Sequence, residues 1–155
     1  MIEGVKNILI EHPIESKILN VKGYVDIVVE MEDGRVYVYD FKTINSWSWK
    51  FKFGRMKESK PSFHQELQLG TYGWAIEKEF GRCDGLALIY YNKDTSVTKQ
   101  FEVENSFIEQ AYNFWTGVID SHKDDKLPPL QEGVAPVMEW ECKYCNFQEL
   151  CEGRN

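Results

Sequence analysis

The chain has 155 residues, 43% of them hydrophobic and 28% charged, and it carries a formal net charge of −7. This length suits one globular domain with its own core, no apolar run approaches the roughly 18 residues that span a bilayer, and the negative charge argues against a protein that coats nucleic acid. Because Glu3, Glu11 and Glu15 interrupt the N-terminal segment, it is not a signal peptide, and we expect a cytoplasmic protein without a membrane partner (in the host cytoplasm if a phage encodes it).

The first part of the chain is strand-like. Val21–Met31 is rich in valine and isoleucine, and Arg35–Lys42 alternates through valine, tyrosine and phenylalanine. Between them, Glu32–Gly34 is typical of a hairpin turn. We therefore expect an antiparallel hairpin.

A basic segment follows, in which lysine and arginine alternate with aromatic residues. One interpretation is a solvated loop, and the other is a loop that grips a phosphate backbone and stacks bases. The residues that we take as candidates for contact with nucleic acid are Trp49, Lys50, Lys52, Arg55 and Lys57.

The remainder predicts a helix, two strands and a second helix, at Ser62–Glu79, Leu86–Tyr91, Val97–Val103 and Ser106–His122. The order of elements indicates an α/β fold in which helices flank a mixed sheet. We expect a single domain over residues 1–155, with a core at 1–134 and a cysteine-bearing tail at 135–155.

The second strand ends in an acid and a lysine that need an explanation. Residues two apart in a strand face the same way, so Asp40 and Lys42 share one face and Phe41 points to the other. An uncompensated buried charge is costly, so these side chains should have partners.

The hairpin register predicts one partner. If the turn is a three-residue loop, Met31 pairs with Arg35, and Asp26 then lies opposite Asp40. A two-residue turn would instead pair Asp26 with Phe41 and mix polar and apolar side chains on both faces. The segregation of apolar residues therefore favours the register that brings the two carboxylates together.

Two close carboxylates repel each other unless a cation lies between them. Oxygen ligands of this kind suit Mg²⁺ or Mn²⁺, and the backbone carbonyl of Phe41 would add a third oxygen if strand pairing ends there. The alternative is a buried ion pair of Asp40 with Lys42 and no metal.

Two further groups carry polar chemistry. Gln68 and Tyr72 are four residues apart on the expected helix, so they share a face and could position a phosphate or a base, or simply form a solvated flank. Three of the four cysteines, Cys142, Cys145 and Cys151, crowd the last fourteen residues, which indicates metal ligation rather than a disulfide framework.

Taken in order, these residues resemble the RecB-like branch of the PD-(D/E)xK nuclease superfamily, which includes CRISPR-associated RecB-like exonucleases and AddB-type nuclease domains. The matching segments are Gly23–Asp26, Asp40–Thr43, Gln68–Tyr72 and the run from Cys142 through Cys145 to Cys151. The resemblance implies a restriction-endonuclease-like core and a metal-dependent deoxyribonuclease, with exonuclease action on single-stranded DNA or duplex ends. It also implies a protein partner in a recombination, repair or CRISPR-type complex.

The resemblance assigns roles to individual residues. Asp26 and Asp40 would bind the divalent metal, Lys42 would assist the attacking water, and Gln68 and Tyr72 would lie beside the site. The metal would lower the pKa of the water and offset the charge that develops on the phosphate.

The resemblance implies a 4Fe–4S cluster held by Cys142, Cys145, Cys151 and a fourth cysteine near the N-terminus. This sequence has no cysteine there, and Cys83 could serve as the fourth ligand. A three-cysteine cluster, a zinc site completed by another residue, and no metal at all also stay open.

The branch also begins with a helix that carries a histidine or acidic metal ligand, whereas only about twenty residues precede Gly23 and they look extended. We therefore expect a shortened family member.

Two other functions remain in view. One is a catalytically weak or silent module of the same fold that binds DNA or a protein partner. The other is a small zinc-stabilised interaction protein that uses only its tail cysteines.

Overall fold

The computed structural model describes residues 3–54, 63–124 and 146. Its strands are β1 (Val5–Ser16), β2 (Val21–Met31), β3 (Val36–Ile44), β4 (Gly85–Asn92) and β5 (Thr98–Val103). Its helices are α1 (Ser46–Phe53), α2 (Phe63–Phe80) and α3 (Ser106–Lys123). The predicted cysteine-bearing tail lies outside the described residues apart from residue 146.

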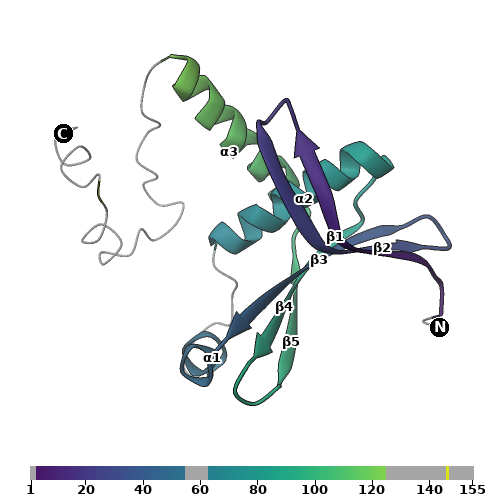
Figure 1. Cartoon of the computed structure of the whole chain (residues 1–155), viewed down its shortest axis with the longest axis vertical. Helices are drawn as coiled ribbons and strands as arrows, with labels where there is room; N and C mark the ends of the chain where they lie inside the picture. The colour runs from purple at the N-terminus through teal and green to yellow at the C-terminus, as the bar shows by residue number, and fades with distance from the viewer. Residues whose placement is uncertain (1–2, 55–62, 125–145, 147–155) are drawn as a thin grey trace.

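The five strands form one sheet in the order β1-β2-β3-β4-β5 (Figure 1). The pair β3–β4 is parallel and the other three pairs are antiparallel, so the prediction of a mixed sheet is confirmed. The parallel pair needs a crossover, and α1 and α2 provide it. The two predicted helices and the last two strands agree with α2, α3, β4 and β5 within a residue or so at each end.

The predicted loop after β3 begins instead with a helix, which corrects the expectation from the sequence. The side chain of Asn45 caps α1 by accepting a hydrogen bond of 2.8 Å from the amide of Ser48. The amide of Ser46 donates to Asp94 at the β4–β5 turn, which ties the start of α1 to the sheet. In Figure 1, α1 lies at the far end of β3, beside the ends of β4 and β5.

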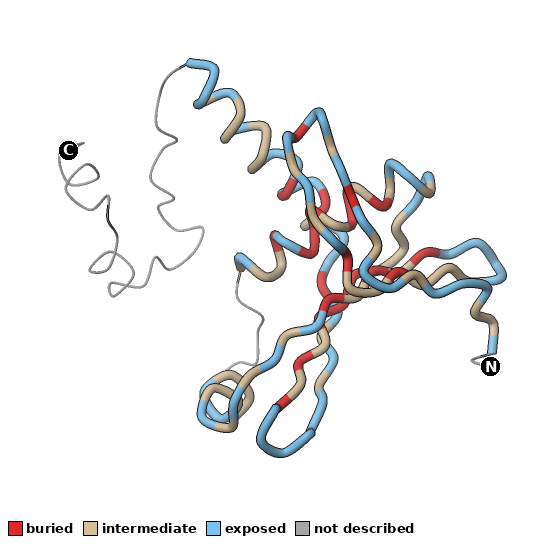
Figure 2. The backbone as a smooth tube through the Cα atoms, viewed as in Figure 1, coloured by how far each residue is buried: buried red, intermediate tan, exposed pale blue. Residues whose placement is uncertain are grey.

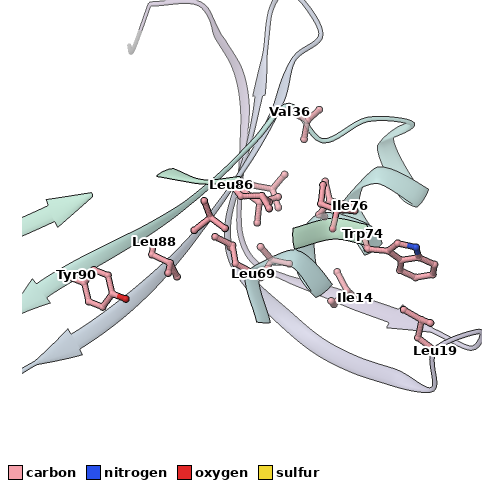
Figure 3. Close-up of a cluster of buried hydrophobic side chains, with 14 residues drawn as sticks. Ile14, Leu19, Val36, Leu69, Trp74, Ile76, Leu86, Leu88 and Tyr90 are labelled. Carbon is pink, nitrogen blue, oxygen red and sulfur yellow. The ribbon is translucent and has the colours of Figure 1, made fainter. Parts of the chain in front are cut away.

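The core lies between the sheet and α2, with α3 packed against α2. The central strands contribute Val28, Val38 and Leu88, each fully buried. Helix α2 contributes Leu69 and Ile76, which are labelled with Leu88 in Figure 3. Figure 2 shows the buried residues concentrated where the strands and α2 meet. None of the described helices is both long enough and apolar enough to span a membrane.

Candidate active site

The β2–β3 hairpin has the register that the sequence predicts. The amide of Met31 donates to the carbonyl of Arg35 over 2.8 Å, and the pairing continues to Ile27 opposite Tyr39. Beyond this pair, a side chain takes the place of the backbone hydrogen bond between the strands. Asp26 Oδ2 accepts a 2.7 Å hydrogen bond from the amide of Phe41. Asp26 is thereby fixed beside the end of β3.

Asp40 is the most deeply placed acid of the site, with only 3% of its surface exposed. Its Oδ2 is buried and lies 2.6 Å from Lys42 Nζ, so the two side chains form an ion pair. Burial raises the pKa of Asp40, the charge of Asp26 raises it further, and the Lys42 ammonium opposes both.

Lys42 joins the sheet to α2. Its Nζ donates a 2.7 Å hydrogen bond to Gln68 Oε1, and Gln68 Nε2 donates to the hydroxyl of Tyr72 over 2.9 Å. Burial is the largest cause of the raised pKa of Tyr72, and the charges of Asp40 and Asp26 add to it. The structure therefore brings together all five side chains predicted for the catalytic site.

The oxygen donors at this place fit a divalent metal. Asp26 and Asp40 supply hard carboxylate oxygens, and the buried Asp40 Oδ2 has the Lys42 ammonium as its ion-pair partner. The Phe41 carbonyl faces the same side of β3 as its amide, toward Asp26, because both groups of a strand residue point to the same neighbour. Within the described ranges no group of three or more His, Cys, Asp or Glu side chains gathers around a common point, so the carboxylates number two.

His12 does not join these carboxylates. It pairs with Val25 across β1 and β2, but its Nε2 lies 2.9 Å from Glu79 Oε2 near the end of α2. Glu79 is seven residues beyond Tyr72 on α2, which is a separation of about 10 Å along the axis.

The residues predicted to contact nucleic acid divide between two faces of α1. Trp49 packs against the core with Phe53, whereas Lys50 is exposed. Lys52 folds inward, with its Nζ 5.0 Å from the ring centroid of Tyr90. The other two predicted contacts, Arg55 and Lys57, lie outside the described residues.

Cys83 is half-buried just before β4, where its thiol donates to the carbonyl of Gly85 over 3.9 Å. Burial raises the pKa of this thiol to about 12, which disfavours the thiolate that a metal requires. The other three predicted cysteine ligands, Cys142, Cys145 and Cys151, lie outside the described residues, so the cluster or zinc site stays a prediction.

Two polar residues near the site were not predicted. Gln65 lies one turn before Gln68 on α2, and Tyr90 pairs with Lys42 across β3 and β4. The spacing of Gln65 and Gln68 is visible in the sequence, but the place of Tyr90 depends on the parallel pairing of distant strands.

The profile of the PD-(D/E)XK nuclease superfamily matches residues 2–152. The chain belongs to this superfamily.

The chain is similar to the CRISPR-associated exonuclease Cas4 of Saccharolobus solfataricus, with 25% identity over 138 residues. That match covers 89% of this chain and 55% of the relative, so the chain spans about half the length of the curated protein. A crystal structure of the protein SSO0001 matches 96% of this chain and 62% of its own, with 19% identity and a TM-score of 0.48.

Proposed function

We propose that this chain is a nuclease domain that hydrolyses DNA phosphodiester bonds with Mg²⁺ or Mn²⁺ held by Asp26, Asp40 and the Phe41 carbonyl. The observation that carries the proposal is the continuous polar row at the end of β3. In this row Asp40, Lys42, Gln68 and Tyr72 contact one another in sequence. Superfamily membership supports the nuclease activity, and the exonuclease mode on single strands or duplex ends follows the likeness to Cas4.

Lys42 supplies a positive charge at the site, and Gln68 and Tyr72 hold it in position. Gln68 directs its Oε1 at Lys42 because its Nε2 is held by the hydroxyl of Tyr72. The Lys42 ammonium is therefore oriented toward the carboxylates, where it can hold the attacking water and offset negative charge on the phosphate. A bound Mg²⁺ or Mn²⁺ would supply Lewis-acid stabilisation of the phosphate oxygens and activate the water.

Cleavage assays on labelled single-stranded and double-stranded DNA test the proposal, with Mn²⁺, Mg²⁺ or EDTA. We expect cutting that EDTA abolishes and that Asp40→Ala and Lys42→Ala each reduce at least about a hundredfold. Asp33→Ala and Lys6→Ala are matched controls, because both residues are exposed and lie away from the site, Asp33 in the β2–β3 turn and Lys6 on β1. Equal cutting by Lys42→Ala and the unmodified protein would refute the assignment of the site.

A second function, a weak or silent module that binds DNA or a protein partner, is favoured by one observation. The described residues offer two carboxylates and no third acidic or histidine ligand beside them. Binding of DNA without cutting under either metal would establish this function instead. A role in a CRISPR-type, repair or recombination complex is proposed on the likeness to Cas4 alone.

A further inference from the structure

Helix α2 carries two glutamines that make matching sets of contacts. Gln68 binds a lysine and a tyrosine, Lys42 and Tyr72. Gln65, one turn earlier on the same face, also binds a lysine and a tyrosine, Lys52 and Tyr90. The first set belongs to the candidate active site, and the second set has no role in it.

The second set is built around Gln65 Oε1. The hydroxyl of Tyr90 donates to this oxygen, and Lys52 Nζ donates to it over 3.4 Å. Lys52 Nζ also lies 5.0 Å from the centroid of the Tyr90 ring, within reach of a cation–π interaction. Three elements therefore meet here: Lys52 comes from α1, Gln65 from α2 and Tyr90 from β4.

The second set of contacts adjoins the first through Tyr90. Tyr90 is the partner of Lys42 in the β3–β4 ladder, so the two sets share a strand pair as well as a helix. Burial is the main cause of the raised pKa of Tyr90, and the charges of Glu66 and then Asp40 raise it further, so this phenol lies near both carboxylates. The two glutamines are three residues apart, a rise of about 4.5 Å along α2.

Lys52 is held in a position that favours an anion. Its burial lowers the pKa of the ammonium, and the charge of Glu66 offsets only part of this effect. Helix α1 contains no acidic residue, and its other lysine, Lys50, is exposed. Besides Gln65 Oε1 and the ring of Tyr90, a phosphate entering the site would give this half-buried ammonium an anionic partner.

We infer that Lys52, positioned by Gln65 and Tyr90, binds a phosphate of the DNA strand beside the candidate active site. This inference rests on the proposed function for its ligand, a DNA strand. It narrows the prediction of a DNA-contacting loop to one phosphate subsite, formed around Lys52 beside the candidate active site.

The test measures binding of single-stranded oligonucleotides in EDTA, in which one phosphate at a time is replaced by an uncharged methylphosphonate. For the unmodified protein we expect a set of positions at which the uncharged linkage weakens binding. In Lys52→Met, which keeps the apolar stem that packs on Tyr90, binding falls about tenfold and the effect disappears at one of these positions. Lys52→Arg should restore it.

Lys50→Ala is the matched control, an exposed lysine on the same helix. It should weaken binding overall. The methylphosphonate at the oligonucleotide position assigned to Lys52 should still weaken binding as it does in the unmodified protein. Gln65→Leu should reduce the same position's effect, with urea unfolding to verify that the variant is folded. If every position keeps its full effect in Lys52→Met, the inference is wrong.

The two proposals fail separately. Loss of one position's effect in Lys52→Met, in a protein that cuts no DNA with either metal, would uphold the phosphate subsite and refute the nuclease activity. Metal-dependent cutting together with an unchanged pattern of positions would do the reverse.

Discussion

Burial of the Asp40 carboxylate destabilises the folded protein when this group is ionised. Its pKa is raised mainly because it is buried, so the folded protein binds this proton more tightly than the unfolded chain does. Stability therefore falls as pH rises from the ordinary aspartate pKa of about 3.9 through the raised value, and the full cost is present above it. Active sites commonly retain such groups because their chemistry requires them.

We expect Asp40→Asn to raise the free energy of unfolding by ~1 kcal/mol at pH 7 while it abolishes cutting. The gain should shrink as the pH is lowered, because the unmodified carboxyl then becomes neutral in the fold. Urea unfolding in EDTA at several pH values measures this difference.

The exposed Asp33 provides the opposite case. Its pKa is lowered, chiefly by the hydrogen bond from the amide of Arg35, so its ionised form stabilises the fold above its ordinary pKa and that contribution is lost as pH falls. Asp33→Asn should therefore lower stability at pH 7. If Asp40→Asn were the less stable of the two variants at this pH, the account of Asp40 as a buried, costly charge would be wrong.

At the scale of elements, α2 presents one face to the candidate site and another to α3. Gln68 and Tyr72 face the site, whereas Thr71 accepts a 2.9 Å hydrogen bond from the indole of Trp115 on α3. At Gly70 the helices approach so closely that an added Cβ would lie 2.1 Å from the carbonyl oxygen of Phe107. The packing of α3 thus fixes the part of α2 from which the site residues project.

Gly70→Ala should destabilise the protein by at least ~2 kcal/mol, because the backbone of α3 must move to admit the methyl group. Gly117→Ala is its control in α3, where no described atom lies within 4 Å of the added Cβ. This second change should stabilise by ~0.5 kcal/mol through helix propensity alone. Thermal unfolding of the two variants measures both effects, and a shift of the same sign in both would contradict the close approach.

The hairpin could be predicted from the sequence because its rule is local. A three-residue turn and the separation of apolar from polar side chains fix the pairing of Met31 with Arg35, and this pairing places Asp26 beside Asp40. Helix α1 could not be predicted in the same way, because its aromatic and lysine residues alternate as they would in a strand or loop. Its N-cap, Asn45, is a residue type that is also common in turns. Its hydrogen bond from Ser46 to Asp94 joins residues 48 positions apart in the sequence.

The contacts of Gln65 show the corresponding limit for the site. The row from Lys42 to Tyr72 needs one strand, one helix and a helical spacing, all of which the sequence displays. The set around Gln65 needs a third element and the register of the parallel β3–β4 pair. Parallel strands are distant in sequence, and no turn sets their register, so Tyr90 could not be placed from the sequence alone.

At the scale of the whole molecule, the two faces of the sheet differ in burial, and the sequence does not say which is the core. Both faces of the hairpin carry apolar residues. Val28 and Val38, on the face of Asp40, are fully buried. On the opposite face, the row from Ile10 through Ile27 to Tyr39 is partly exposed, and Ile10 is 72% exposed.

Two truncations on neighbouring strands test this difference. Val28→Ala removes methyl groups from the packed face and should cost ~2 kcal/mol of unfolding free energy, whereas Ile10→Ala should cost less than ~0.5 kcal/mol. Urea unfolding at low protein concentration measures both. A loss from Ile10→Ala as large as that from Val28→Ala would mean that the open face is packed in solution. If that loss grew with protein concentration, a second copy of the chain would be what covers it, because only association depends on concentration.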